Sequence, residues 1–154
     1  MKGHCTCGEC SYELTDAPLF VHCCHCRWCQ RETGAAFALN ALIEASKVKV
    51  LSGAPVGVDT PSESGKGQTI YRCPTCQVAL WSVYSGSGPT FNFIRVGTLE
   101  NPDACPPDIH IFTESKQPWV ILPEDVPAMP QYYRRSMHWP QASLDRRAAA
   151  LADH

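Results

Sequence analysis

Short runs of apolar residues, separated by glycine, proline and serine, recur along the first 112 positions of the chain. Runs such as 47–51 and 69–72 alternate polar and apolar residues, which is typical of strands with one wet face. The runs are rich in Val, Ile, Phe and Tyr, which favour β-structure. The pattern predicts a mostly β fold of antiparallel sheets, with strands over residues 11–14, 19–23, 36–43, 47–51, 68–73, 78–84, 90–96 and 108–112.

Helical signals are few. One short helix is predicted around residues 28–32, and a C-terminal tail helix is predicted with Ser143 as its N-cap. Residues 53–67 predict a polar loop, which either borders a binding cleft or is a plain solvated insertion. The chain later becomes proline-rich, so we expect a zinc-binding domain over residues 3–130 and a C-terminal extension over 131–154.

Composition excludes several classes of function. The 154 residues include 13 Lys and Arg against 15 Asp and Glu, and the net charge of −2 gives no general field that attracts nucleic acid or an anionic membrane. The N-terminus has no apolar signal region, and no later stretch is long enough to span a bilayer. We therefore expect a cytoplasmic protein whose partners are small molecules, in a reducing compartment where thiolates stay available for metal.

Seven of the ten cysteines fall into three tight clusters, which are Cys5 and Cys7, then Cys24, Cys26 and Cys29, then Cys73 and Cys76. Disulfides are disfavoured, because the chain is long enough to bury its own core and a Cys-x-Cys pair is too short for an easy bridge. Zn²⁺ instead takes thiolate ligands around a tetrahedron, and two thiolates separated by one or two residues can bind one edge of it. The clusters therefore predict metal binding.

The cluster sizes predict two zinc sites of different character. A structural zinc is usually saturated by four protein ligands, whereas a catalytic zinc keeps three and leaves a position open. Two pairs make a closed site, and a triplet makes an open one. We assign Cys5, Cys7, Cys73 and Cys76 to a structural zinc and Cys24, Cys26 and Cys29 to an open zinc; alternatively, one zinc takes four of the seven cysteines.

Polar neighbours of the triplet offer further chemistry. His22 and His25 are candidates for a fourth ligand or a proton relay, and Arg27 and Arg31 are candidate partners for substrate carboxylates. An ordinary surface or capping role is the alternative for each of the four.

Three cysteines lie outside the clusters. We expect Cys10 in the core and Cys105, beside two prolines, in a loop. Cys23 points away from Cys24 in an extended segment, which favours burial over a role as resolving thiol or alternative ligand.

Further motifs accompany the clusters in a fixed order over residues 3–130. They are Gly3 and Gly8 around the first pair, Gly34 after the triplet, Val96-Gly97-Thr98-Leu99, His110-Ile111-Phe112, Lys116 and Trp119. With these motifs the chain resembles the glutathione-dependent formaldehyde-activating enzyme (GFA) family. The resemblance implies a zinc β-fold of the type shared with methionine sulfoxide reductase B, with the same structural and catalytic zinc assignment.

The resemblance also implies an activity. In this family the proposed reaction adds the thiol of glutathione, the co-substrate, to formaldehyde and gives S-hydroxymethylglutathione, which is a carbon–sulfur lyase reaction run in reverse. Zinc is expected to bind and deprotonate the thiol or to orient the aldehyde, so that the reactants meet in one site. Cys24, Cys26 and Cys29 would then be the catalytic centre.

Two departures from the family pattern concern Gln30, where arginine is frequent, and Gln77, where glycine is frequent. We expect the first to remove a carboxylate partner and the second to alter the turn locally. Two other functions remain open. A thiol carrier or protein-interaction module needs the same open zinc, whereas a reductase like methionine sulfoxide reductase B needs a cysteine on a late core strand, and residues 90–96 contain none.

Overall fold

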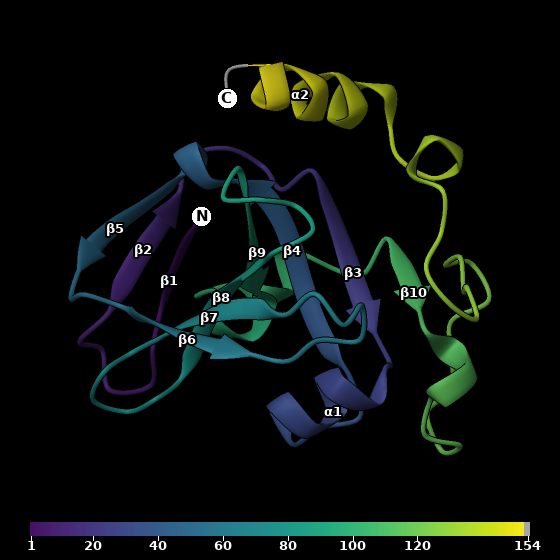
Figure 1. The fold of residues 1–154 in the computed structure, drawn as a ribbon, viewed down its shortest axis with the longest axis horizontal. Helices are drawn as coiled ribbons and strands as arrows, with labels where there is room; N and C mark the ends of the chain where they lie inside the picture. Colours follow the sequence, from purple (N-terminus) through teal and green to yellow (C-terminus); the bar gives the residue numbers. More distant parts are fainter. Residues whose placement is uncertain (153–154) are drawn as a thin grey trace.

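The computed structural model describes residues 1–152 and is built around a mixed seven-stranded sheet (Figure 1). The strand order is β10-β3-β4-β9-β8-β7-β6, and every neighbouring pair is antiparallel except β10 and β3, which are parallel. The strands are β3 (Phe20–Cys24), β4 (Ala38–Glu44), β6 (Val56–Thr60), β7 (Gln68–Arg72), β8 (Ala79–Tyr84), β9 (Phe91–Arg95) and β10 (Ile109–Ile111).

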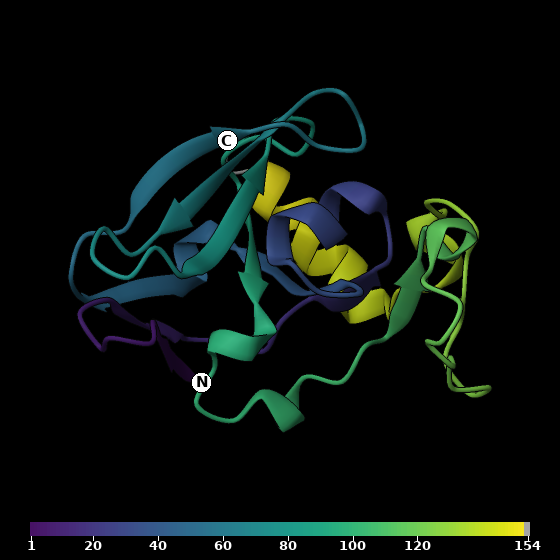
Figure 2. The same cartoon turned by 90° about the horizontal axis from the view of Figure 1, so that it is seen from below.

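A second sheet has three strands in the order β1-β2-β5, formed by β1 (Lys2–His4), β2 (Ser11–Leu14) and β5 (Val48–Ser52). Tyr12 and Leu14 point from β2 into the first of two core clusters, together with Ile43, Leu80 and Ile94 from the larger sheet. Figure 2 shows this small sheet and the chain that follows β10 on opposite sides of the molecule. The burial of these side chains joins the two sheets into one body.

The mostly β prediction is confirmed, and each predicted strand exists within two residues of its expected bounds. The expectation of antiparallel sheets is wrong for one pair, because Ile109, His110 and Ile111 run parallel to His22, Cys23 and Cys24. All three residues of β10 are buried, as is usual for a parallel strand. Strand β1 was not predicted, because Lys2, Gly3 and His4 include no apolar side chain.

The prediction of a polar loop over residues 53–67 is wrong for its first half. Residues 56–60 form β6, the edge strand of the large sheet, which pairs with β7. Val56 and Val58 are about half exposed, so the strand buries no face that periodicity could reveal. Residues 61–67 form the turn that follows β6. This turn borders a cavity, which was one of the two alternatives predicted for the loop.

Two α-helices lie at opposite ends of the long strands β3 and β4 (Figure 1). Helix α1 (Arg27–Thr33) confirms the first helix prediction, and α2 (Gln141–Ala152) confirms the second. Ser143 is not an N-cap, because α2 begins two residues earlier, where the Pro140 carbonyl accepts from the Ser143 and Leu144 amides. None of the helices in the described part of the chain is long and apolar enough to cross a membrane.

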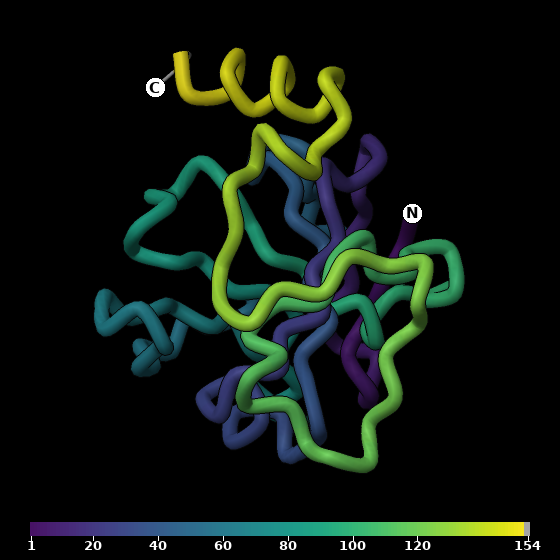
Figure 3. Tube along the Cα trace, turned by 90° about the vertical axis from the view of Figure 1, so that its right-hand side faces the viewer, coloured from purple at the N-terminus to yellow at the C-terminus, as the bar shows by residue number. Residues whose placement is uncertain are grey.

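The chain between β10 and α2 makes a long excursion across one side of the molecule, which Figure 3 shows as the green to yellow tube. It is fixed to the second core cluster by Trp139, which is 5% exposed and stacks on Phe20 with ring centroids 5.3 Å apart. Arg146 of α2 adds two hydrogen bonds to the buried Glu44 carboxylate, at 3.0 and 2.7 Å. Trp139 and Arg146 therefore anchor this part of the chain to β3 and β4.

Candidate metal centres and cavity

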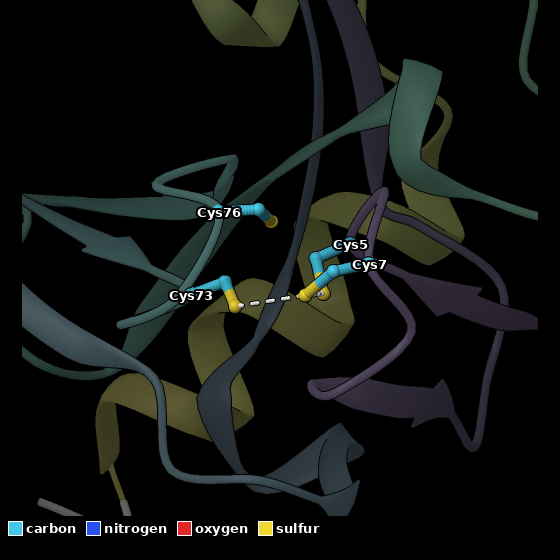
Figure 4. A group of neighbouring side chains, drawn as sticks. All are labelled: Cys5, Cys7, Cys73 and Cys76. Carbon is cyan, nitrogen blue, oxygen red and sulfur yellow. Dashed lines mark hydrogen bonds between the residues drawn. The ribbon is translucent and has the colours of Figure 1, made fainter.

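The four cysteines predicted to form a closed site come together between the two sheets (Figure 4). Their sulfur atoms all lie within 4.8 Å of one another, with Sγ–Sγ distances of 3.5 Å between Cys5 and Cys7 and 3.7 Å between Cys7 and Cys73. A tetrahedron with Zn–S bonds of about 2.3 Å has edges of roughly 3.8 Å. The spacing of these sulfurs therefore fits one tetrahedral metal ion with four thiolate ligands.

Turns at the ends of strands hold both cysteine pairs. The Cys10 amide donates to the Cys5 sulfur at 3.3 Å, and the Gln77 amide donates to the Cys73 carbonyl at 3.0 Å. Hydrogen bonds from the Cys7 and Val78 backbone lower the pKa of Cys76 below its ordinary value. Such amides favour the thiolate form, the form that binds metal.

The expectation that Gln77 alters the turn relative to other family members stays a prediction. Gln77 adopts φ of 62°, in the left-handed region that glycine enters most easily. Its side-chain amide donates to the Pro74 carbonyl at 2.8 Å, an interaction that glycine cannot make. Gln77 thus takes a positive φ and also bonds to the turn through its side chain.

The three cysteines of the triplet also converge, and all three are buried. Cys24 ends β3, and Cys26 is the N-cap of α1, where its sulfur accepts from the Cys29 amide at 3.3 Å. One helical turn then brings Cys29 beside Cys26. Hydrogen bonds from the Cys24 and Cys29 thiols and from the helix amides hold the pKa of Cys26 well below its ordinary value. The amides at the helix cap therefore favour the thiolate form of Cys26.

Helix α1 is held to the sheet by a buried carboxylate. Glu32 bonds Arg72 of β7 through one oxygen at 2.6 Å and Arg95 of β9 through the other at 3.0 Å. Arg95 also donates to Asn40 of β4. These bonds tie the helix that carries Cys26 and Cys29 to three strands of the large sheet.

The two thiol groups differ in their access to ligand. Cys24, Cys26 and Cys29 line a cavity of about 620 Å³, whereas none of Cys5, Cys7, Cys73 and Cys76 does. Trp28, Tyr84 and Phe93 are among its aromatic walls, and Lys66, Arg135, Glu63 and Glu114 are its charged residues. Its volume lies in the range of roughly 300–1,000 Å³ that is usual for small-molecule sites. The triplet is therefore the group that a substrate can approach.

The histidines beside the triplet take separate places. Neither joins the group of three sulfurs within 4.8 Å, so the described residues do not include a histidine as fourth ligand. His22 lines the cavity, and burial together with the positive charge of Arg135 lowers its pKa to about 3. His25 instead faces Cys23 at 3.6 Å and His110 at 3.0 Å.

The polar residues of α1 take places that the sequence did not indicate. Arg27 donates to the Gln30 side chain at 2.9 Å, and Arg31 lies 6.0 Å from the ring of Trp28. Neither arginine belongs to the cavity lining, so their role as carboxylate partners stays a prediction. Gln30 is buried and donates to the His25 and Ser115 carbonyls, which joins α1 to the chain after β10.

Sequence reasoning missed the cavity residues outside the cysteine motifs. Lys66 follows the edge strand β6, and Gln131, Tyr132 and Arg135 come from the segment before α2. Behind them, the Tyr133 hydroxyl lies 2.6 Å from His22 Nε2 and 2.7 Å from the Trp139 indole nitrogen. The signal that could have found them is the concentration of aromatic and cationic residues in an otherwise proline-rich tail.

The three remaining cysteines are all buried. Cys10 belongs to the core cluster beside Cys5, as predicted, and Cys105 lies in the loop after a 3₁₀ turn. The burial of Cys23 is confirmed. Its sulfur belongs, however, to a third group with His25 and His110, in which the potential ligand atoms are all within 4.8 Å. The parallel pairing of β10 with β3 creates this group.

These features define a mostly β protein with one group of four thiols between its two sheets and one group of three thiols that faces a cavity. The model of the family described as glutathione-dependent formaldehyde-activating enzyme matches residues 1–115, and the chain belongs to this family. A crystal structure of a protein from Rhodobacter sphaeroides shares the fold, with a TM-score of 0.51 and 22% identity over 83% of this chain and 99% of that one. A comparison with curated proteins found no match.

Proposed function

We propose that this protein is a zinc-dependent carbon–sulfur lyase that acts on a thiol–aldehyde adduct, with glutathione and formaldehyde as the substrate pair. The observation that carries the proposal is the contrast between the two thiol groups. Three buried sulfurs meet at a cavity, and the four sulfurs between the two sheets do not line it. Family membership supports glutathione and formaldehyde as the reactants.

The residues suit these roles. Cys5, Cys7, Cys73 and Cys76 would hold a structural zinc, and Cys24, Cys26 and Cys29 would hold a second zinc, which supplies a Lewis acid with one position free for a thiol sulfur. The aromatic walls of the cavity exclude water from the bound reactants. Addition of a thiol to formaldehyde needs little chemical help, so the main contribution of the site is to bring the reactants together.

Charge in the cavity matches glutathione, which has two carboxylates and one ammonium group. Lys66 and Arg135 offer two cations, and Glu63 and Glu114 offer an anion for the ammonium. Arg27 and Arg31 remain further candidates at the outer face of α1. A reducing cytoplasm suits the ten free cysteines and is where glutathione is abundant, so we place the protein there.

The test is exchange NMR of glutathione and formaldehyde, because the spontaneous reaction hides weak catalysis in other assays. We expect zinc-loaded protein to accelerate exchange, Cys24→Ser protein to lose this acceleration, and Cys105→Ser protein, altered at a buried cysteine outside both groups, to keep it. If exchange with the zinc-loaded protein proceeds at the spontaneous rate, the proposal of catalysis is refuted. If the protein then still binds glutathione tightly, it is a thiol carrier instead.

Recognition of the carboxylates is tested separately by calorimetry with S-methylglutathione, which cannot react. Arg135→Gln should weaken binding by about tenfold, the usual scale for losing one charge-assisted hydrogen bond. Arg134→Gln removes a neighbouring exposed arginine that does not line the cavity and should leave the affinity unchanged. Equal affinities of both variants and the unmodified protein would exclude Arg135 as the anchor.

A further inference from the structure

The segment before α2 reaches the cavity wall behind Cys24 through a chain of three side chains. Trp139, Tyr133 and His22 are joined by hydrogen bonds of 2.7 and 2.6 Å, and Trp139 and His22 are at most 5% exposed. Tyr133 and Trp139 lie beyond residue 115, where the family match ends. This contact is therefore a feature of the chain outside the matched region.

The direction of one of these bonds is fixed, and the other has a preferred direction. An indole nitrogen can only donate, so the Tyr133 oxygen accepts from Trp139. If His22 Nε2 also donated to this oxygen, both the Tyr133 proton and the lone pair of the buried His22 Nδ1 would lack a partner among the described residues, whereas donation from Tyr133 to Nε2 leaves one group unpaired. A neutral imidazole that accepts at Nε2 carries its proton on Nδ1. The pairing therefore favours the Nδ1–H tautomer of His22.

The Nδ1 atom of His22 is buried and has no hydrogen-bond partner among the described residues. A buried donor without a partner is costly, and most such donors in native proteins have one. His22 lines the cavity together with Cys24, two residues further along β3 and therefore on the same face of the sheet. A ligand in this cavity therefore meets the face of the sheet that carries both His22 and Cys24.

We propose that His22 is a substrate-binding residue, which donates from Nδ1 to the aldehyde oxygen or to the hydroxyl of the adduct, and that Tyr133 is the positioning residue that fixes this tautomer. The inference rests on the proposed function. It explains how the site would distinguish a substrate with a hydroxymethyl group on sulfur from one with an ethyl group of nearly the same shape. During addition, the thiolate sulfur forms a bond to carbon and the carbonyl π pair moves to oxygen. The oxygen then takes a proton from water, which replaces the proton lost by the thiol, and His22 keeps its own.

The first measurement is the tautomer of His22 by long-range ¹⁵N–¹H NMR on the full zinc-loaded chain. We expect the Nδ1–H form in the unmodified protein, loss of this single form in Tyr133→Phe, and no change in Tyr132→Phe, whose hydroxyl contacts Arg135 instead. An Nε2–H tautomer in the unmodified protein overturns the proposal.

The second measurement compares two ligands of nearly equal shape, S-hydroxymethylglutathione and S-ethylglutathione, with equal excess formaldehyde in both samples. We expect the unmodified protein to bind the hydroxymethyl ligand about three- to tenfold more tightly, the range for one net hydrogen bond. His22→Phe should remove this preference, and Tyr133→Phe should reduce it. Binding of both ligands without a preference, or a preference that survives in both variants, overturns the inference alone. Binding of neither ligand overturns the proposed function with it.

Discussion

Glu32 joins α1 to two strands, and its loss should destabilise the protein more than the loss of any exposed carboxylate. The side chain of Glu32 is 8% exposed and that of Arg95 is 9% exposed, so their ion pair is buried. The pair of Glu32 with Arg72, whose side chain is 25% exposed, is partly open to water. Glu32→Gln keeps the size of the side chain and removes its charge, which leaves the Arg95 guanidinium without a counter-charge.

The expected cost follows from this burial. Removing one partner of a buried ion pair costs about 3–5 kcal/mol, because the other charge stays buried and unpaired. The Arg72 side of the interaction adds little, because exposed pairs contribute about 0–1 kcal/mol. The glutamine oxygen keeps one hydrogen bond, and Arg95 keeps its bond to Asn40. We therefore expect a loss of about 3 kcal/mol in the free energy of unfolding, or roughly 6–12 °C in Tm for a chain of this length.

Urea unfolding in reducing buffer with a fixed excess of zinc measures this cost, because the fixed excess holds the stabilisation by metal constant. Asp16→Asn is the matched control, since Asp16 is 43% exposed and lies 3.9 Å from Lys47. The control should change the free energy of unfolding by less than about 0.5 kcal/mol. If Glu32→Gln costs no more than Asp16→Asn, the buried pair does not anchor α1.

Three further outcomes are expected. Cys73→Ser should prevent folding, because the four-cysteine group joins the N-terminus to the middle of the chain; a soluble protein that melts cooperatively would show that this group is not structural. Cys24→Ser should stay folded and bind one zinc where the unmodified protein binds two, as counted by elemental analysis, and a count of one in the unmodified protein would exclude a second site. Gln77→Val should lower the free energy of unfolding in urea by about 1–2 kcal/mol, because a β-branched residue disfavours a positive φ. Gln77→Gly should change this free energy by less than about 0.5 kcal/mol. Similar costs for the two variants would show that backbone conformation is not the cause.

The grouping of the seven clustered cysteines could be predicted because short spacings constrain geometry directly. A Cys-x-x-Cys turn brings two sulfurs together in any fold, and the choice between two sites followed from counting ligands. Strands such as β7 and β8 were predictable for a similar reason, since Ile70 and Leu80 are fully buried in runs of strand-forming residues. In both cases a local pattern in the sequence carries the information.

The rest depends on contacts between distant segments. Strand β6 has no buried face, and it is a strand because its backbone pairs with the backbone of β7. His25 turns away from the triplet because the parallel strand β10 places His110 beside it, and sequence spacing does not reveal strand direction. Tyr133 and Trp139 lie in a stretch without periodicity, and although the aromatic residues of this tail indicate a binding or packing role, they do not reveal that its partner is His22.

The order in which the parts of the site occur along the chain sets the order in which a ribosome delivers them. Synthesis of Cys29 completes the triplet early, synthesis of Cys76 completes the four-cysteine group later, and Trp139 is synthesised last. At about 5–20 residues per second, roughly 2–10 s separate the first two events, and a similar interval precedes Trp139. A nascent chain therefore exposes the three thiols of the triplet, which can bind metal, before the four-cysteine group and the cavity wall are complete. Rapid metal delivery or a chaperone would protect those thiols from oxidation during this interval.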